Sequence, residues 1–78
     1  MKRVCVHGLG YIGLPTALIL ADHNFTVTGV DTDENVVEAV NMARLHIVEK
    51  GLDDLLKSAI SNKKLIAKTS PSYAEIHI

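Results

Sequence analysis

The chain has 78 residues, enough for one small domain, and 47% of them are hydrophobic, which excludes a disordered chain. Its formal net charge of −1, with four histidines counted as neutral, gives no basic excess for nucleic acid. No apolar run approaches the roughly 18 residues that span a bilayer, so we expect a cytoplasmic protein with neither a membrane nor a nucleic acid as partner.

A short apolar strand, residues 3–7, is followed at once by the loop Gly8-Leu9-Gly10-Tyr11-Ile12-Gly13. A strand, a glycine-rich loop and a helix in this order are the context in which G-x-G-x-x-G binds the pyrophosphate of a dinucleotide. Gly8 permits the tight turn, Gly10 lets the phosphates approach the backbone, and Gly13 lets the helix pack closely on the strand. The free N–H groups at the start of the helix favour phosphate as well.

Two reactive side chains lie in this first strand. Cys5 is the only cysteine, and we interpret it as a core thiol without a disulfide, catalytic or metal-binding role. His7 ends the strand just before Gly8. Its ring either leans toward a bound cofactor or has a structural role facing solvent, and the sequence leaves both readings open.

The first helix is predicted over residues 11–22. Its apolar residues cover more than one face, so we expect it to be largely buried. Pro15 falls in the first turn, where its missing N–H removes no helical hydrogen bond. Tyr11 and Ile12 occupy the variable positions of the loop, and we expect their backbone to contact the pyrophosphate.

A second strand, residues 25–30, is rich in β-branched residues and leads directly into Asp31. Asp31 lies 23 positions after Gly8, close to the roughly 20 expected of the acid that binds the adenosine ribose. Its carboxylate can accept hydrogen bonds from the 2′- and 3′-hydroxyls and would repel the 2′-phosphate of NADP. We therefore predict NAD as the cofactor. The alternative is that Asp31 only caps the next helix.

The remaining elements complete an alternating pattern of strands and helices. A second helix starts in residues 31–34, a third covers residues 51–62, a third strand covers 65–68, and a fourth opens at 76–78. Asp33 and Glu34 are interpreted as first-turn helix charges, and His46 has no second histidine at ligand spacing, so we predict no metal site. The pattern predicts an α/β fold, a Rossmann-type parallel sheet with flanking helices, strand order 3-2-1-4, truncated in the fourth strand.

The run Gly8-Leu9-Gly10-Tyr11-Ile12-Gly13-Leu14-Pro15-Thr16-Ala17 closely resembles the start of the UDP-glucose/GDP-mannose dehydrogenase family. The resemblance continues through Gly29-Val30-Asp31 and Gly51-Leu52, and the run from His46 to Glu49 looks most like the branch that acts on UDP-N-acetyl-D-mannosamine. Ala43 and Lys50 stand where the family usually has Gly and Pro, so we expect a different local path there.

The resemblance implies that residues 1–78 are the N-terminal NAD-binding domain of a longer, homo-oligomeric dehydrogenase of polysaccharide biosynthesis. Such an enzyme oxidises the sugar CH2OH of a UDP-sugar to a carboxylate with NAD, through a cysteine thiol in a later part of the chain. Cys5 matches no part of that motif, so the resemblance implies no catalytic residue among these 78, which we expect to be inactive alone. The alternatives are a stand-alone NAD-binding module and the front of another NAD-dependent hydroxyacid dehydrogenase.

Overall fold

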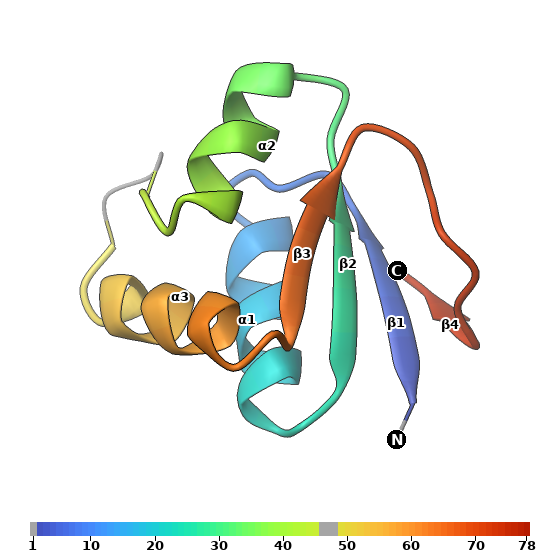
Figure 1. Cartoon of the computed structure of the whole chain (residues 1–78), viewed down its shortest axis with the longest axis horizontal. Helices are drawn as coiled ribbons and strands as arrows, with labels where there is room; N and C mark the ends of the chain where they lie inside the picture. The colour runs from blue at the N-terminus through green and yellow to red at the C-terminus, as the bar shows by residue number, and fades with distance from the viewer. Residues whose placement is uncertain (1, 46–48) are drawn as a thin grey trace.

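The computed structural model describes residues 2–45 and 49–78. Strands and helices alternate along the first half of the chain (Figure 1). The elements are β1 (Arg3–His7), α1 (Gly13–Asp22), β2 (Thr26–Val30), α2 (Glu34–Asn41), α3 (Leu52–Ser61), β3 (Leu65–Lys68) and β4 (Ile76–His77). No helix among the described residues is long and apolar enough to cross a membrane.

The four strands form one parallel sheet in the order β3-β2-β1-β4. This confirms the predicted Rossmann-type order, in which the chain moves outward from β1 to β3 and then returns to the other side of β1. The register aligns His7 at the end of β1 with Val30 at the end of β2. The carboxyl ends of the two strands therefore lie side by side, at the edge where open α/β sheets bind ligands.

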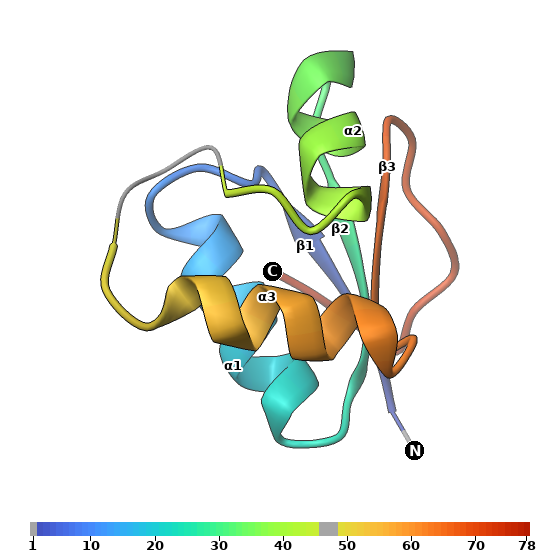
Figure 2. The ribbon, with the colours of Figure 1, turned by 60° about the vertical axis from the view of Figure 1, so that its left-hand side comes forward.

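The three helices cover one face of the sheet, and the segment between β3 and β4 runs on the side away from them (Figure 1). Side chains alternate along β1, so Val4 and Val6 join the core beneath the helices while Cys5 points to the opposite face. Turning the molecule brings α3 in front of α1, and the two helices pack on each other (Figure 2). The largest fully buried side chains of the core are Leu9, Leu14, Leu18, Leu56, Val4, Val6, Val27 and Val40.

Helix α1 differs from its prediction in two ways. It begins at Gly13 rather than at residue 11, because Tyr11 and Ile12 form a turn that belongs to the glycine loop. Second, one apolar residue of the helix faces outward, since Ile19 is 54% exposed. The helix packs on the sheet and on α3 mainly through Leu14, Ala17, Leu18 and Ala21, with the half-buried Leu20 beside them. The other elements begin or end within three residues of their predicted positions.

All three helices end in the same backbone motif, with a left-handed residue directly after the C-cap. These residues are Asn24 (φ 71°), Ala43 (φ 56°) and Lys63 (φ 58°). At the end of α2, for example, Ala43 N donates to Val40 O and Arg44 N donates to Ala39 O. This pair of bonds defines a Schellman motif, whose left-handed position is usually glycine. Ala43 occupies that position at the end of α2.

A side chain covers part of the outer edge of the sheet. Asn41, the last residue of α2, donates from Nδ2 to the carbonyl of Ala67 (2.9 Å) and accepts at Oδ1 from the N–H of Ala67 (2.8 Å). Ala67 lies in β3, the edge strand. The carboxamide therefore pairs with β3 in the way that the backbone of another strand would, and it ties α2 to the sheet.

Candidate cofactor site

The site begins where the chain leaves β1. Gly8 N donates a 2.7 Å hydrogen bond to Val30 O, which extends the β1–β2 pairing by one residue. Gly8 then takes φ +92°, a left-handed conformation that favours glycine and turns the chain sharply out of the sheet. The loop that follows therefore lies over the carboxyl ends of β1 and β2.

The other two glycines of the loop differ in what surrounds them. A Cβ atom placed on Gly13 would lie 1.7 Å from Gly8 O, so only glycine lets α1 start this close to the end of β1. A Cβ atom placed on Gly10 would meet nothing within 4 Å. Gly10 thus borders open space, as expected of a position at which a phosphate group approaches the backbone.

Leu9 anchors the loop from below. Its side chain is fully buried in the core, and a Cβ atom on Gly29 would lie 2.7 Å from Leu9 Cδ2. Gly29 in β2 therefore provides the space that Leu9 fills. This pairing was not predicted from the sequence, although a glycine inside a β-branched strand is a known sign of a close approach by another group.

The Asp31 carboxylate connects three segments. Its Oδ2 accepts a 3.0 Å hydrogen bond from Leu9 N, and its Oδ1 accepts a 2.9 Å hydrogen bond from Asp33 N. The N-cap of α2 is Asp33, whose carboxylate accepts from Asn35 N (2.9 Å), so the alternative that Asp31 caps this helix is wrong. Asp31 instead holds the glycine loop against the end of β2.

Two hollows meet above the carboxyl ends of the strands. One, of about 440 Å³, is bordered by Val6, His7, Gly8, Gly10, Tyr11, Ile12, Gly13, Thr16 and Ile78. The second, of about 360 Å³, is bordered by His7, Gly8, Val30, Asp31 and Thr32. The first lies between β1 and β4, where the strand order reverses, and this is the crevice in which open α/β sheets bind nucleotides.

The start of α1 faces the first hollow with its backbone. Ile12 is the N-cap and makes no side-chain capping bond, and the first turn contains no acidic residue. The first N–H groups of a helix carry a partial positive charge and lack partners within the helix. Together with the open space at Gly10, this end of the helix suits the pyrophosphate of a dinucleotide. Tyr11, 78% exposed, borders the same hollow.

The reactive side chains of β1 have defined surroundings. Cys5 is fully buried, as predicted for a core thiol. The exposed ring of His7 lies with Nε2 3.0 Å from Nδ1 of His77, and His7 also borders both hollows. Within the run Leu45 to Glu49, for which we predict no metal site, residues 46–48 lie outside the described residues.

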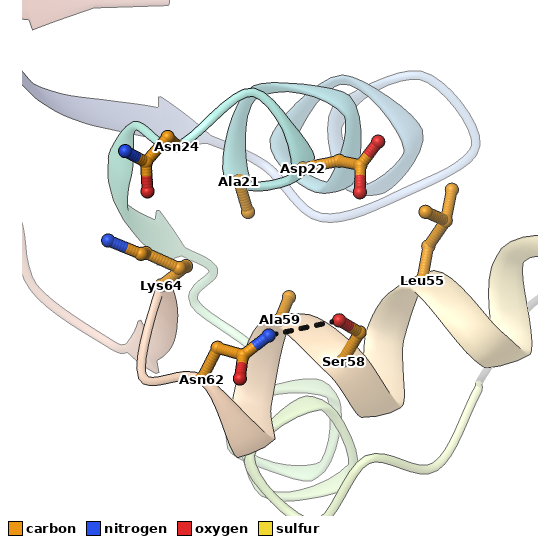
Figure 3. Close-up of a pocket in the computed structure, with 8 residues that line it drawn as sticks. All are labelled: Ala21, Asp22, Asn24, Leu55, Ser58, Ala59, Asn62 and Lys64. Carbon is orange, nitrogen blue, oxygen red and sulfur yellow. Dashed lines mark hydrogen bonds between the residues drawn. The ribbon is translucent and has the colours of Figure 1, made fainter.

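A third hollow, of about 430 Å³, lies between the end of α1 and α3 (Figure 3). It is bordered by Ala21, Asp22, Asn24, Leu55, Ser58, Ala59, Asn62 and Lys64, with Asn62 Nδ2 donating to Ser58 Oγ across 3.1 Å. Asn24 and Lys64 come just before β2 and β3, so this hollow is at the amino ends of the strands. Ligands of open α/β sheets bind at the opposite end, and we do not assign the cofactor to it.

Comparisons with known proteins agree with this geometry. Residues 2–78 match the UDP-glucose/GDP-mannose dehydrogenase family, NAD binding domain. UDP-N-acetyl-D-mannosamine dehydrogenase of Campylobacter jejuni is 47% identical over 99% of this chain, which spans 19% of that protein. The NDP-N-acetyl-D-galactosaminuronic acid dehydrogenase of Ralstonia solanacearum is 46% identical over 95% of this chain, which spans 18% of it.

Solved structures of such enzymes share the fold. UDP-N-acetyl-mannosamine dehydrogenase from Staphylococcus aureus superposes on 97% of this chain with a TM-score of 0.94 and 33% identity. GDP-mannose dehydrogenase from Pseudomonas aeruginosa, solved as a ternary complex, superposes on 90% with a TM-score of 0.83 and 31% identity. The chain covers 18% and 16% of these two structures, respectively.

Proposed function

Since the chain belongs to the UDP-glucose/GDP-mannose dehydrogenase family, with residues 2–78 matching its NAD-binding domain, we propose that it is the N-terminal domain of a nucleotide-sugar 6-dehydrogenase. NAD is the cofactor of this domain. In the proposed enzyme these residues hold its adenosine and pyrophosphate. The observation that carries the proposal is the placement of the glycine loop and Asp31 together over the carboxyl ends of β1 and β2.

Each part of the loop has a role in this proposal. The backbone N–H groups of Tyr11, Ile12 and Gly13 at the start of α1 bind the pyrophosphate, which approaches through the space beside Gly10. Gly8 turns the chain so that these groups face the hollow. We assign the adenosine ribose to Asp31, because this residue borders the second hollow and a carboxylate accepts hydrogen bonds from hydroxyl groups.

The chemistry itself lies outside the described residues. The glycine loop and Asp31 would hold NAD, whose nicotinamide would supply the hydride acceptor for the oxidation. A thiol that attacks an aldehyde must be accessible, and Cys5 is fully buried on the strand, so we assign it no part in the reaction. The 78 residues span under a fifth of the two curated relatives described above, and the activity of the whole enzyme is part of the proposal.

For the whole enzyme we propose oxidation of the sugar CH2OH of UDP-N-acetyl-D-mannosamine to a carboxylate in two NAD-dependent steps. The choice of sugar is supported by the 47% identity to relatives that carry the name of this activity. The enzyme would supply a charged sugar for polysaccharide synthesis, act in the cytoplasm where nucleotide sugars and NAD are available, and assemble as a homo-oligomer.

The test uses the full-length protein that carries this sequence. NAD binding is measured by calorimetry, and NADH formation is followed by absorbance with UDP-N-acetyl-D-mannosamine, UDP-glucose and GDP-mannose in parallel. The proposal expects NAD to bind more tightly than NADP and two NADH to form for each UDP-N-acetyl-D-mannosamine consumed. Absence of NAD binding would refute the cofactor role, and NADH formed only with another sugar would refute the choice of substrate. Light scattering of the same sample reports the oligomeric state.

A further inference from the structure

A cluster of three metal-binding side chains lies where β1 meets β4, beneath the edge of the cofactor site. Cys5 and His7 are two positions apart on β1, so their side chains project from the same face of the sheet. The register places His77 of β4 directly opposite Cys5. The sulfur of Cys5 and one ring nitrogen of each histidine all lie within 4.8 Å of one another. We propose that Cys5, His7 and His77 bind a divalent transition-metal ion such as Zn²⁺.

The distance between the two histidine nitrogens is close to the one that zinc requires. Zn–N bonds of about 2.0–2.1 Å and Zn–S bonds of about 2.3 Å at tetrahedral angles place neighbouring donor atoms roughly 3.3–3.6 Å apart. His7 Nε2 and His77 Nδ1 are 3.0 Å apart, and the two rings are tilted by 33° with centroids 5.2 Å apart. One ring shares its N–H with the other in this state. An ion that displaces this proton has only to separate the two nitrogens slightly.

The backbone holds the three donors in place. Ile78 N donates to Cys5 O and His7 N donates to Ile78 O, both at 2.9 Å. Both bonds are made by Ile78, directly after His77, and Glu75 N donates to Arg3 O (3.2 Å) before it, so β4 is held against β1 on both sides of His77. The donors therefore come from a paired sheet rather than from free loops, and the ion would draw together a sulfur and two nitrogens that already lie within 4.8 Å of one another.

The donor set selects the class of metal. One thiolate and two imidazoles suit Zn²⁺ and its transition-metal neighbours, whereas Mg²⁺ and Ca²⁺ prefer oxygen ligands. Cys5 is fully buried and both histidines are exposed, so a bound ion would have protein on one side and its fourth position toward solvent. Binding removes a proton from the thiol, so the affinity should rise with pH. This proposal differs from our prediction from the sequence, in which no residues had the spacing of a metal site.

The experiment uses the full-length protein after removal of metals with a chelator. Zn²⁺ is titrated against a competing indicator, and Co²⁺ is used as a spectroscopic probe because a thiolate ligand gives it a charge-transfer absorption. The variants are Cys5→Ala, His7→Gln and His77→Gln. The matched control is His23→Gln, since His23 is exposed, its ring bonds to Ile19 O at the end of α1, and it is not part of the cluster.

We expect each of the three variants to weaken Zn²⁺ binding by at least about tenfold, because loss of outer-shell partners alone costs roughly 10–100-fold. His23→Gln should keep the affinity, and Cys5→Ala should abolish the charge-transfer band. Unchanged Zn²⁺ affinity in His7→Gln and His77→Gln would overturn the proposal, even if the buried substitution Cys5→Ala impaired folding. NAD titration of the metal-free protein keeps this test separate, because the proposed cofactor role requires binding without metal.

Discussion

The carboxylate of Asp31 lies 3.0 Å from the backbone nitrogen of Leu9 and accepts its proton. This bond joins the end of β2 to the middle of the glycine loop across 22 positions of sequence. The other oxygen accepts from Asp33 N at the start of α2. The acid that we propose for ribose binding is therefore also the group that holds the glycine loop in its observed conformation.

Substitution of Asp31 should change both affinity and cofactor preference. A charged acceptor contributes about 1.5–3 kcal/mol to a hydrogen bond, so Asp31→Ala should weaken NAD roughly 10- to 100-fold. The lost negative charge should bring the NADP affinity closer to that for NAD. Calorimetry with both cofactors measures this. Asp22→Ala, at the far end of α1, is the charge-matched control. An unchanged preference in Asp31→Ala would contradict the assignment.

Alanine at Gly13 should destabilise the protein, whereas alanine at Gly10 should not. Gly13→Ala places a methyl group 1.7 Å from Gly8 O, a backbone atom that cannot move aside, and should cost more than about 3 kcal/mol of stability. Gly10→Ala meets open space and should fold. Gly10→Val should also fold but lose NAD binding, because its side chain fills the phosphate approach. Thermal unfolding and NAD titration separate the two outcomes, and equal melting temperatures for the two alanine variants would contradict this prediction.

Leu9 and Gly29 should be energetically coupled. Leu9→Ala removes a fully buried side chain and should cost about 2–5 kcal/mol. Gly29→Ala forces Leu9 to shift and should cost roughly 1–3 kcal/mol. In the double variant the new methyl group enters the space that Leu9 leaves. In denaturant unfolding, the loss of stability in the double variant should be about 0.5–3 kcal/mol smaller than the sum of the losses in the two single variants. Strict additivity would show that the two sites are independent.

The Schellman motifs predict an order of stabilisation by glycine. Ala43→Gly relieves a left-handed alanine and should stabilise the protein by about 0.5–1.5 kcal/mol. Lys63→Gly should give a similar gain, and Asn24→Gly a smaller one, because asparagine tolerates this conformation. Chemical denaturation of the three variants measures the order. A loss of stability in Ala43→Gly would mean that unfolded-chain entropy outweighs the relief of strain.

Asn41 should contribute to stability through its two bonds to Ala67. Asn41→Ala leaves the N–H and the carbonyl of Ala67 without this partner, at a cost of about 1–3 kcal/mol. The control is Asn62→Ala, because Asn62 makes an exposed bond to Ser58 on the surface of α3 and should change stability by less than about 0.5 kcal/mol. Equal effects of the two substitutions on the free energy of unfolding would contradict the assigned role.

The order of the strands and the location of the glycine loop were predictable from the sequence because they depend on local patterns. The apolar run before Gly8 and the β-branched run before Asp31 each specify a buried parallel strand, and their order allows few topologies. The start of α1 was placed too early because a loop conformation, not helix propensity, determines the path at Tyr11 and Ile12.

Contacts between distant segments were not predictable in the same way. The pairing of Leu9 with Gly29 and the second role of Asp31 depend on tertiary distances that no spacing along the chain reveals. The approach of His7 to His77, separated by 70 positions, arises only once β4 pairs with β1. The two-residue spacing of Cys5 and His7 was visible in the sequence, but the pairing of Cys5 with His77 was not.

The carboxamide of Asn41 blocks part of one edge of the sheet. An intruding strand from another molecule would need the N–H and carbonyl of Ala67, and both are already occupied at the β3 edge. Such occupied edges resist the strand-to-strand addition that begins aggregation. At Ala67 the β3 edge is therefore closed by a side chain, whereas the other edge of the sheet is formed by β4.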